Sequence, residues 1–283
     1  MTTGTVHSEG ADLVYDHEGD GPPLLCIAGG GGEASQFARI SPLLAGDHTV
    51  IRYDRRGNSR STGGADLDMA QQARDAAAVI RAVTGEPAFV FGNSGGGSIG
   101  FALAAEHPSL VRGLIAHEAP SVALLPDADI WMAFTDRVHA TYLADGAAAA
   151  FKIFAGELVG FGTGRHEGRI GSGEPVSANA EYSLAHEYLQ FARDQPDLDA
   201  IRSNGVPVAT ASGLDSADAY YARTARAQAE RLRCAHHVFP GNHLGFMFRS
   251  SEFADALRQA LDGLAPGRSG SSAGEQPSAV PPP

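Results

Sequence analysis

The chain has 283 residues, enough for one large domain with a sizeable core. Hydrophobic residues make up 43% and charged residues 19%, and no apolar run approaches the roughly 20 residues of a membrane-spanning helix. Composition therefore argues against a disordered body and against a membrane partner. The net charge of -12 would repel a phosphate backbone, so we expect no nucleic-acid partner.

Short apolar runs bounded by turn residues alternate with helical stretches, as expected of a parallel sheet covered by helices. The predicted strands, in chain order, are Leu13 to His17, Pro23 to Ala28, Thr49 to Tyr53, Ala88 to Gly92, Gly113 to His117, Val206 to Ser212 and His236 to Phe239. Helices are predicted over Met69 to Val83, Ser98 to Glu106 and Glu252 to Leu264. This alternation predicts the α/β class.

One interval, 120–204, departs from the alternation, because it is rich in aromatic residues and interrupted by glycines. We interpret it as a helical cap inserted into a body formed by 1–119 and 205–264. Six glycines between positions 160 and 173 suggest a mobile lid. The segment 265–283 is almost entirely small, polar or proline, which is too little apolar area to offset the entropy of ordering. We expect it to be a disordered tail.

The start of the chain, Met1 to Gly10, has neither a basic leader nor an apolar stretch of signal-peptide length. We therefore expect a cytoplasmic protein. The two cysteines, Cys26 and Cys234, form no metal-ligand spacing and no disulfide framework, so we expect reduced thiols. No motif in the sequence predicts a metal or a cofactor.

The strongest local signal is a Gly-x-Ser-x-Gly pattern at Gly92, Ser94 and Gly96, between an apolar run and a helix-capable stretch. Such a strand-to-helix turn lifts the serine hydroxyl out of the sheet, and its crowding demands small neighbours. With 35 glycines in the chain the pattern alone is weak, and it recurs at Gly96, Ser98 and Gly100. No strand precedes Ser98, so we predict Ser94 as a nucleophile. The alternative is a serine that only caps a helix.

A second glycine-rich loop, Gly29 to Gly32, follows another predicted strand. Glycine lets backbone N–H groups come within about 3 Å of the oxygen that becomes negative in a tetrahedral intermediate. We predict that the amides of Gly30 and Gly95 form such an oxyanion hole. A phosphate-binding loop is the alternative, but the loop lacks a following Lys-Ser/Thr pair and the Gly-x-Gly-x-x-Gly spacing.

The predicted general base is His243, one of 11 histidines. It lies in a tight turn after the last predicted strand and shortly before the final helix. Imidazole titrates near neutral pH and can take the proton that makes a serine hydroxyl nucleophilic. The chain order of serine, then acid, then histidine favours this position over the other histidines.

Together with the turn from Tyr53 to Ser61, these motifs resemble the α/β-hydrolase superfamily over residues 10–264. The resemblance implies an α/β-hydrolase fold, with a mostly parallel sheet flanked by helices and an inserted helical cap, and cofactor-free serine chemistry. The sequence is most similar to zearalenone-type lactone hydrolases. This similarity lies in the segment from Gly92 to Pro120, in Gly30-x-Gly32-Glu33 and in Pro240-Gly241-x-His243.

The acid that would orient the histidine is ambiguous. In most α/β-hydrolases it follows the penultimate strand, which indicates Asp215, although this residue follows Gly213 one position too early. The strand ending at His117 is followed by Glu118, and the similarity to zearalenone-type lactone hydrolases implies this carboxylate. We favour Glu118 and keep Asp215 as the alternative. Each residue also has a non-catalytic alternative. Glu118 would be a loop carboxylate bonded to local backbone amides, and Asp215 would be the N-cap of the following helix.

The predicted function is hydrolysis of a small apolar ester or lactone through an acyl-enzyme on Ser94. A serine there argues against dehalogenase and epoxide hydrolase chemistry, which in this superfamily uses aspartate. Thioester hydrolysis, perhydrolysis and acyl transfer remain open. The alternative from another class is a non-catalytic or tailoring protein that binds a small apolar molecule.

Overall fold

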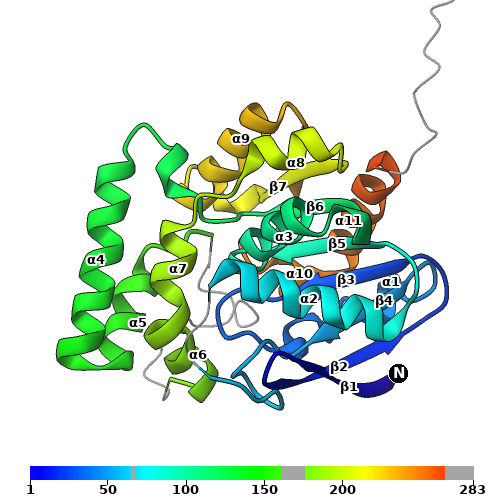
Figure 1. Cartoon of the computed structure of the whole chain (residues 1–283). Helices are drawn as coiled ribbons and strands as arrows, with labels where there is room; N and C mark the ends of the chain where they lie inside the picture. The colour runs from blue at the N-terminus through cyan, green and yellow to red at the C-terminus, as the bar shows by residue number, and fades with distance from the viewer. Residues whose placement is uncertain (65–67, 161–175, 265–283) are drawn as a thin grey trace, which may run out of the picture.

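The computed structural model describes residues 1–64, 68–160 and 176–264 (Figure 1). Its strands are β1 (Thr2–Ser8), β2 (Ala11–Glu18), β3 (Pro23–Ile27), β4 (Thr49–Tyr53), β5 (Ala88–Asn93), β6 (Val111–His117), β7 (Val208–Gly213) and β8 (Ala235–Phe239). Its α-helices are α1 (Ser41–Leu44), α2 (Met69–Val83), α3 (Gly95–Glu106), α4 (Ala128–Asp145), α5 (Ala147–Gly156), α6 (Ala178–Tyr182), α7 (Tyr188–Arg193), α8 (Leu198–Asn204), α9 (Tyr220–Leu232), α10 (Gly245–Phe248) and α11 (Ser250–Leu264). Shorter helical turns are η1 (Ala34–Phe37), η2 (Pro108–Leu110), η3 (Val122–Leu124), the π-helical η4 (Ser183–Glu187) and η5 (Leu214–Ser216).

The strands form one eight-stranded sheet in the order β1-β2-β4-β3-β5-β6-β7-β8. β2 pairs antiparallel with β1 and β4, and all other neighbours run parallel. The carboxyl ends of β5, β6, β7 and β8 therefore lie along the same side of the sheet. The loops that follow these strands come from distant parts of the sequence and lie together there. The α/β-hydrolase fold predicted from the sequence is confirmed.

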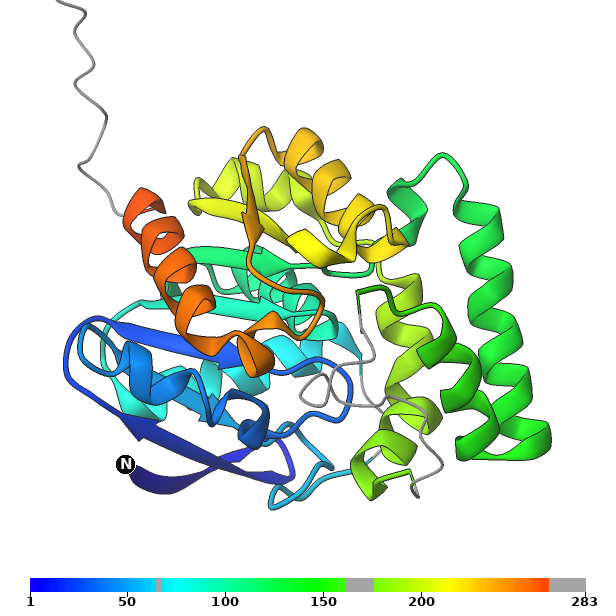
Figure 2. The ribbon, with the colours of Figure 1, turned by 180° about the vertical axis from the view of Figure 1, so that it is seen from behind.

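Both faces of the sheet are buried, because successive side chains of a strand point to opposite faces. In β3, Leu25 and Ile27 belong to the core beneath α2, α3, α8 and α9. Leu24 and Cys26 belong to the core beneath α1, α10 and α11. Figure 1 shows α2 and α3 in front of the sheet, and Figure 2 shows the orange to red α10 and α11 covering the other face. All five residues of β3 are buried.

The helices α4 to α7 lie beside the sheet rather than on it (Figures 1 and 2). They share a small core of their own, formed by Phe134, Val138, Ala150 and Leu184. The next helix, α8, packs against α3 and α9, and its Ile201 is fully buried in the main core. The predicted lid glycines beyond residue 160 and the predicted tail 265–283 lie outside the described residues.

The predicted strand limits agree with the structure to within two residues, and helix α2 agrees at both ends. Helix α11 begins two residues earlier than predicted, and larger differences occur at β1 and α3. Strand β1 is not predicted, because its residues are mostly polar and the strand is exposed at the edge of the sheet. Helix α3 begins at Gly95, not at Ser98, because the turn at Ser94 opens directly into the helix despite three glycines of low helix propensity. No helix within the described ranges is long and apolar enough to cross a membrane.

Candidate active site

Ser94 stands at the sharp turn between β5 and α3, with φ 56° and ψ -127°. A positive φ is costly for a residue with a side chain, so the surrounding structure must hold this turn in place. The N–H of Ser94 donates to His117 O at 2.8 Å, and the N–H of Gly97 donates to Ser94 O at 2.8 Å. A Cβ added to Gly92 would lie 2.2 Å from Gly96 O, which explains why small residues flank the serine.

Glu118 and His243 meet beside this turn. His243 Nδ1 and Glu118 Oε2 are 2.6 Å apart, and the N–H of Gly213 donates to Glu118 Oε1 at 2.8 Å. The side chain of Glu118 is fully buried and that of His243 is 9% exposed. The first carboxylate after β6 thus reaches across the end of β7 to the histidine that follows β8. The structure brings together the predicted base and the favoured acid.

Asp215 takes a different partner. Its carboxylate is 38% exposed and lies 4.0 Å from Arg249. Its backbone N–H donates to Gly241 O at 2.8 Å, so the residue lies near the histidine turn while its side chain interacts elsewhere. It is also not the N-cap of α9, a position taken by Ala219. The structure does not bring Asp215 to His243.

The ionisation of Glu118 follows from its neighbours. Burial raises the pKa of this carboxyl, but the nearby His117 and the hydrogen bond from His243 outweigh burial and hold the pKa below its ordinary value. Burial lowers the pKa of His117 itself to about 4, so that ring is neutral at pH 7. At pH 7 the hydrogen bonds of His243 and Gly213 therefore keep Glu118 ionised.

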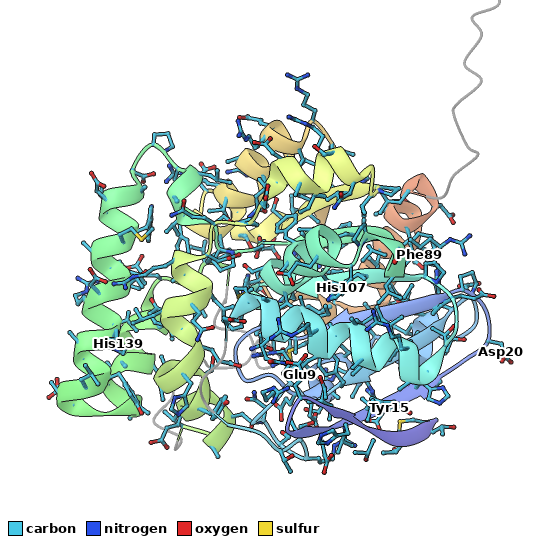
Figure 3. All side chains as sticks on the ribbon, in the orientation of Figure 1. Glu9, Tyr15, Asp20, Phe89, His107 and His139 are labelled. Atoms are coloured by element: carbon cyan, nitrogen blue, oxygen red, sulfur yellow. The ribbon has the colours of Figure 1, made fainter. Side chains whose placement is uncertain are left out.

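The neutral ring of His117 belongs to the support of the turn. Its Nδ1 lies 2.7 Å from Asn93 Oδ1, and it stacks on Phe239 with 5.9 Å between ring centroids. Two other histidines lie away from Ser94: His107 follows α3 at the opposite end of that helix, and His139 lies on α4 (Figure 3).

The glycine loop after β3 packs against the serine turn. A Cβ added to Gly29 would lie 2.7 Å from Ser94 Cβ and 3.3 Å from Gly95 N. A Cβ added to Gly95 would lie 2.6 Å from the ring of Phe191, so that glycine is also required by packing. The two glycine-rich loops that the sequence singles out are therefore adjacent, with Gly30 on the cavity wall.

A cavity of about 320 Å³ connects these groups. Ser94 and His243 line it from the body, and aromatic side chains line it from α5 and α7. Among the described residues on its wall none is lysine or arginine, and Glu33 is the one acidic residue. The remaining wall is mainly apolar and is formed by Pro120, Phe151, Phe154, Leu158, Leu184, Tyr188, Phe191, Tyr220, Tyr221, Leu244 and Met247.

Sequence reasoning misses several of these wall residues. Tyr221, on α9, lies against His243 with 4.7 Å between ring centroids, and its hydroxyl oxygen accepts from the N–H of Val159 at 2.8 Å. Leu244 and Met247 directly follow the histidine turn. For these two residues, the signal in the sequence is their place after the predicted base, whereas the aromatic residues of the interval 120–204 already point to Phe151, Phe154, Tyr188 and Phe191 as candidate wall residues.

Comparison with known proteins adds the family. Residues 22–201 match the family model described as alpha/beta hydrolase fold. The chain belongs to the alpha/beta hydrolase family. This family member is 28% identical over 271 residues to an uncharacterized hydrolase, YraK, of Bacillus subtilis (strain 168), covering 93% of this chain and 97% of YraK.

Two solved structures are similar to this alpha/beta hydrolase at low sequence identity. A thermophilic esterase from Thermogutta terrifontis has a TM-score of 0.74 and 19% identity, covering 93% of this chain and 99% of the esterase. Est816, described as an N-acyl homoserine lactone degrading enzyme, has a TM-score of 0.70 and 22% identity, covering 90% and 99%. At these identities the likeness establishes a shared fold.

Proposed function

We propose that the protein is a serine hydrolase that cleaves a carboxylic ester or a lactone. The observation that carries this proposal is that Ser94, at a strained turn, and His243, bonded to the buried Glu118, line one apolar cavity. Membership of the alpha/beta hydrolase family and the fold shared with an esterase and a lactone-degrading enzyme support it.

The base in this proposal is Nε2 of His243. An ionised carboxylate only accepts hydrogen bonds, so Nδ1, which faces Glu118, carries the ring hydrogen of the neutral imidazole. The lone pair is then on Nε2, which takes the hydroxyl proton as Ser94 Oγ attacks the substrate carbonyl. Glu118 fixes the tautomer and stabilises the imidazolium that forms.

The rest of the reaction follows from the same groups. Negative charge forms on the carbonyl oxygen, and the N–H groups of Gly30 and Gly95 stabilise it. The imidazolium of His243 returns its proton to the leaving alkoxide, which departs as an alcohol, or stays tethered in a lactone, and leaves an acyl-enzyme on Ser94. Water, deprotonated by His243, then attacks the acyl carbonyl, and the proton returns to Ser94 as the acid is released.

The cavity favours an uncharged substrate with an apolar body. Its wall is mainly aromatic and aliphatic, and no lysine or arginine among the described wall residues would anchor a carboxylate. Burial of apolar carbon would supply most of the binding free energy. The sequence similarity to zearalenone-type lactone hydrolases adds macrocyclic lactones to this substrate class.

The proposal is tested with p-nitrophenyl esters of increasing acyl length and with lactones, including the macrocyclic lactone zearalenone. The wild type should hydrolyse at least one of them, and Ser94→Ala should lower kcat about 10³-fold or more. The matched control is Ser98→Ala, which changes the other Gly-x-Ser-x-Gly match, a buried serine inside α3. It should retain kcat within about twofold. Ligand binding without turnover by the wild type would instead favour a non-catalytic binding protein.

A further inference from the structure

Arg55, two residues beyond β4, is a buried cation that none of the steps above uses. Its side chain is fully buried, and the two hydrogen bonds that this side chain donates to backbone reach the start of the glycine loop. Nε donates to Ala28 O at 3.0 Å, and Nη2 donates to Gly29 O at 2.7 Å. One rigid guanidinium therefore holds two successive carbonyls of the loop that contributes the Gly30 amide.

The second of these carbonyls shares a peptide unit with a predicted oxyanion donor. The carbonyl of Gly29 and the N–H of Gly30 are the two ends of one planar trans peptide, so the direction of one fixes the direction of the other. A cation on the carbonyl oxygen also draws electron density through the peptide and strengthens the N–H as a donor. Arg55 thus acts on the Gly30 N–H without touching the cavity.

Arg55 also supports the other predicted donor, through Phe191. The guanidinium carbon lies 5.2 Å from the centroid of the Phe191 ring. The same ring packs against Gly95, where an added Cβ would come within 2.6 Å of it. The guanidinium and the serine turn therefore contact the same ring, so the loop of Gly30 and the turn of Gly95 both pack on groups that Arg55 contacts.

The charge of Arg55 is balanced by Glu187, which lies 132 positions later in the π-helical turn η4. The two side chains form a bidentate pair, with Arg55 Nη2 to Glu187 Oε2 at 2.8 Å, and both are fully buried. Gln72 Nε2 lies 3.4 Å from Glu187 Oε1. The same turn carries Ser183 and Leu184 on the cavity wall, so the ion pair joins the glycine loop to the wall that faces the substrate.

We propose that Arg55 is a positioning residue for the oxyanion hole, which orients and polarises the Gly29–Gly30 peptide, and that Glu187 couples this peptide to the cavity wall formed by η4. The inference rests on the proposed serine hydrolase function. It goes beyond a structural ion pair, because a pair that only held two segments together would affect stability without a specific effect on the charged transition state.

The test uses a paired apolar replacement, Arg55→Met with Glu187→Leu, so that no buried charge is left alone. The neighbouring pair provides a matched control, because Arg56 binds Asp75 at 2.7 and 2.8 Å and donates to Ser8 O at 2.8 Å, away from the glycine loop. The control variant is Arg56→Met with Asp75→Leu. Thermal unfolding is recorded for each variant, and kinetics are measured below its transition.

The kinetic probe is p-nitrophenyl butyrate. For the Arg55 and Glu187 variant we expect kcat to fall about 10- to 100-fold with KM changed by less than about threefold, since the hole loses orientation but keeps its donors. The affinity for an aliphatic trifluoromethyl ketone, which adds to the serine and places an oxyanion in the hole, should fall by a similar factor. The control variant should keep kcat within about twofold, whatever its unfolding temperature.

If the paired variant does not fold, the single variant Arg55→Lys provides a second test of the inference. It keeps the charge beside Glu187 but lacks the planar fork that reaches both carbonyls, so kcat should fall about tenfold with KM little changed. A folded variant with wild-type kcat, or an equal loss of kcat in the control, overturns the inference. A wild type that hydrolyses no ester and does not react with the ketone overturns the proposed function itself, which is a distinguishable result.

Discussion

The carboxylate of Glu118 lies 2.6 Å from Nδ1 of His243, although 125 positions separate the two residues in the chain. The contact depends on strand order, because β7 lies between β6 and β8 and its last residue, Gly213, donates to the other oxygen of Glu118. The N–H of Glu118 also donates to Ala211 O at 3.0 Å. The sheet, rather than local sequence, brings this carboxylate to the histidine.

The two carboxylates should differ sharply in their effect on catalysis. We expect Glu118→Gln to lower kcat about 10³-fold or more, because an amide no longer enforces the tautomer with hydrogen on Nδ1 and cannot stabilise the imidazolium. Asp215→Asn should keep kcat within about threefold, because this side chain faces Arg249. Steady-state hydrolysis of p-nitrophenyl butyrate measures both, and the reverse order would make Asp215 the acid.

His117 should make stability depend on pH. Burial lowers its pKa to about 4, from an ordinary value of 6.5. Between pH 6.5 and pH 4 this ring binds a proton in the unfolded chain but not in the folded protein, so stability is lost as the pH falls through that range. The loss from this group is on the order of 3 kcal/mol. Glu118, whose pKa is lowered, adds a further loss below about pH 4.5.

Urea unfolding at several values between pH 7 and pH 4 measures this effect. His117→Phe removes the titrating ring and keeps an aromatic group against Phe239. Its free energy of unfolding should fall less steeply with pH than that of the wild type, whatever its value at pH 7. Parallel curves for the two proteins would show that His117 is not held neutral by the fold.

The turn at Ser94 should not tolerate a methyl group at Gly96. A Cβ there would lie 2.0 Å from Ile27 O, a backbone atom of the central strand β3. Gly96→Ala should therefore lower the free energy of unfolding by about 3 kcal/mol or more, although replacing glycine by alanine inside a helix ordinarily raises it. The control is Gly85→Ala, where nothing lies within 4 Å of the new Cβ, and it should change stability little. Equal urea midpoints for the two variants would contradict the close packing of β3 and α3.

The cavity wall should set the preferred acyl length. Phe154 lines the cavity and packs edge-on to Tyr188 with 5.7 Å between ring centroids. Phe154→Ala enlarges the cavity and makes room for a longer acyl chain, so kcat/KM for p-nitrophenyl octanoate should rise about tenfold relative to the butyrate. Leu143→Ala, at a side chain 71% exposed on α4, should leave that ratio unchanged. An unchanged ratio in both variants would place the acyl chain elsewhere.

The fold and the two glycine loops could be predicted from the sequence because each depends on local pattern. Five residues of β3 form a continuous apolar run, and the glycines that follow mark a close backbone approach. The edge strand β1 carries no such signal, since Val6 is the one aliphatic residue among its seven and the strand is mostly exposed.

The groups that depend on long-range packing could not be predicted in the same way. The choice between Glu118 and Asp215 depends on which carboxylate faces the histidine turn, and that follows from strand order. The pair of Arg55 with Glu187 joins segments 132 positions apart, one of them in an interval without a regular pattern. No local pattern in the sequence pairs these two charges with each other.

Labelling with a biotinylated fluorophosphonate tests the central claim most directly, because this reagent modifies a serine only when a neighbouring base activates it. Intact-protein and peptide mass spectrometry should find one adduct on the wild type, at Ser94, and the same adduct on Ser98→Ala. Ser94→Ala should remain unmodified. A wild type that stays unlabelled, or a Ser94→Ala variant labelled as fast as the wild type, would contradict Ser94 as the nucleophile of a serine hydrolase.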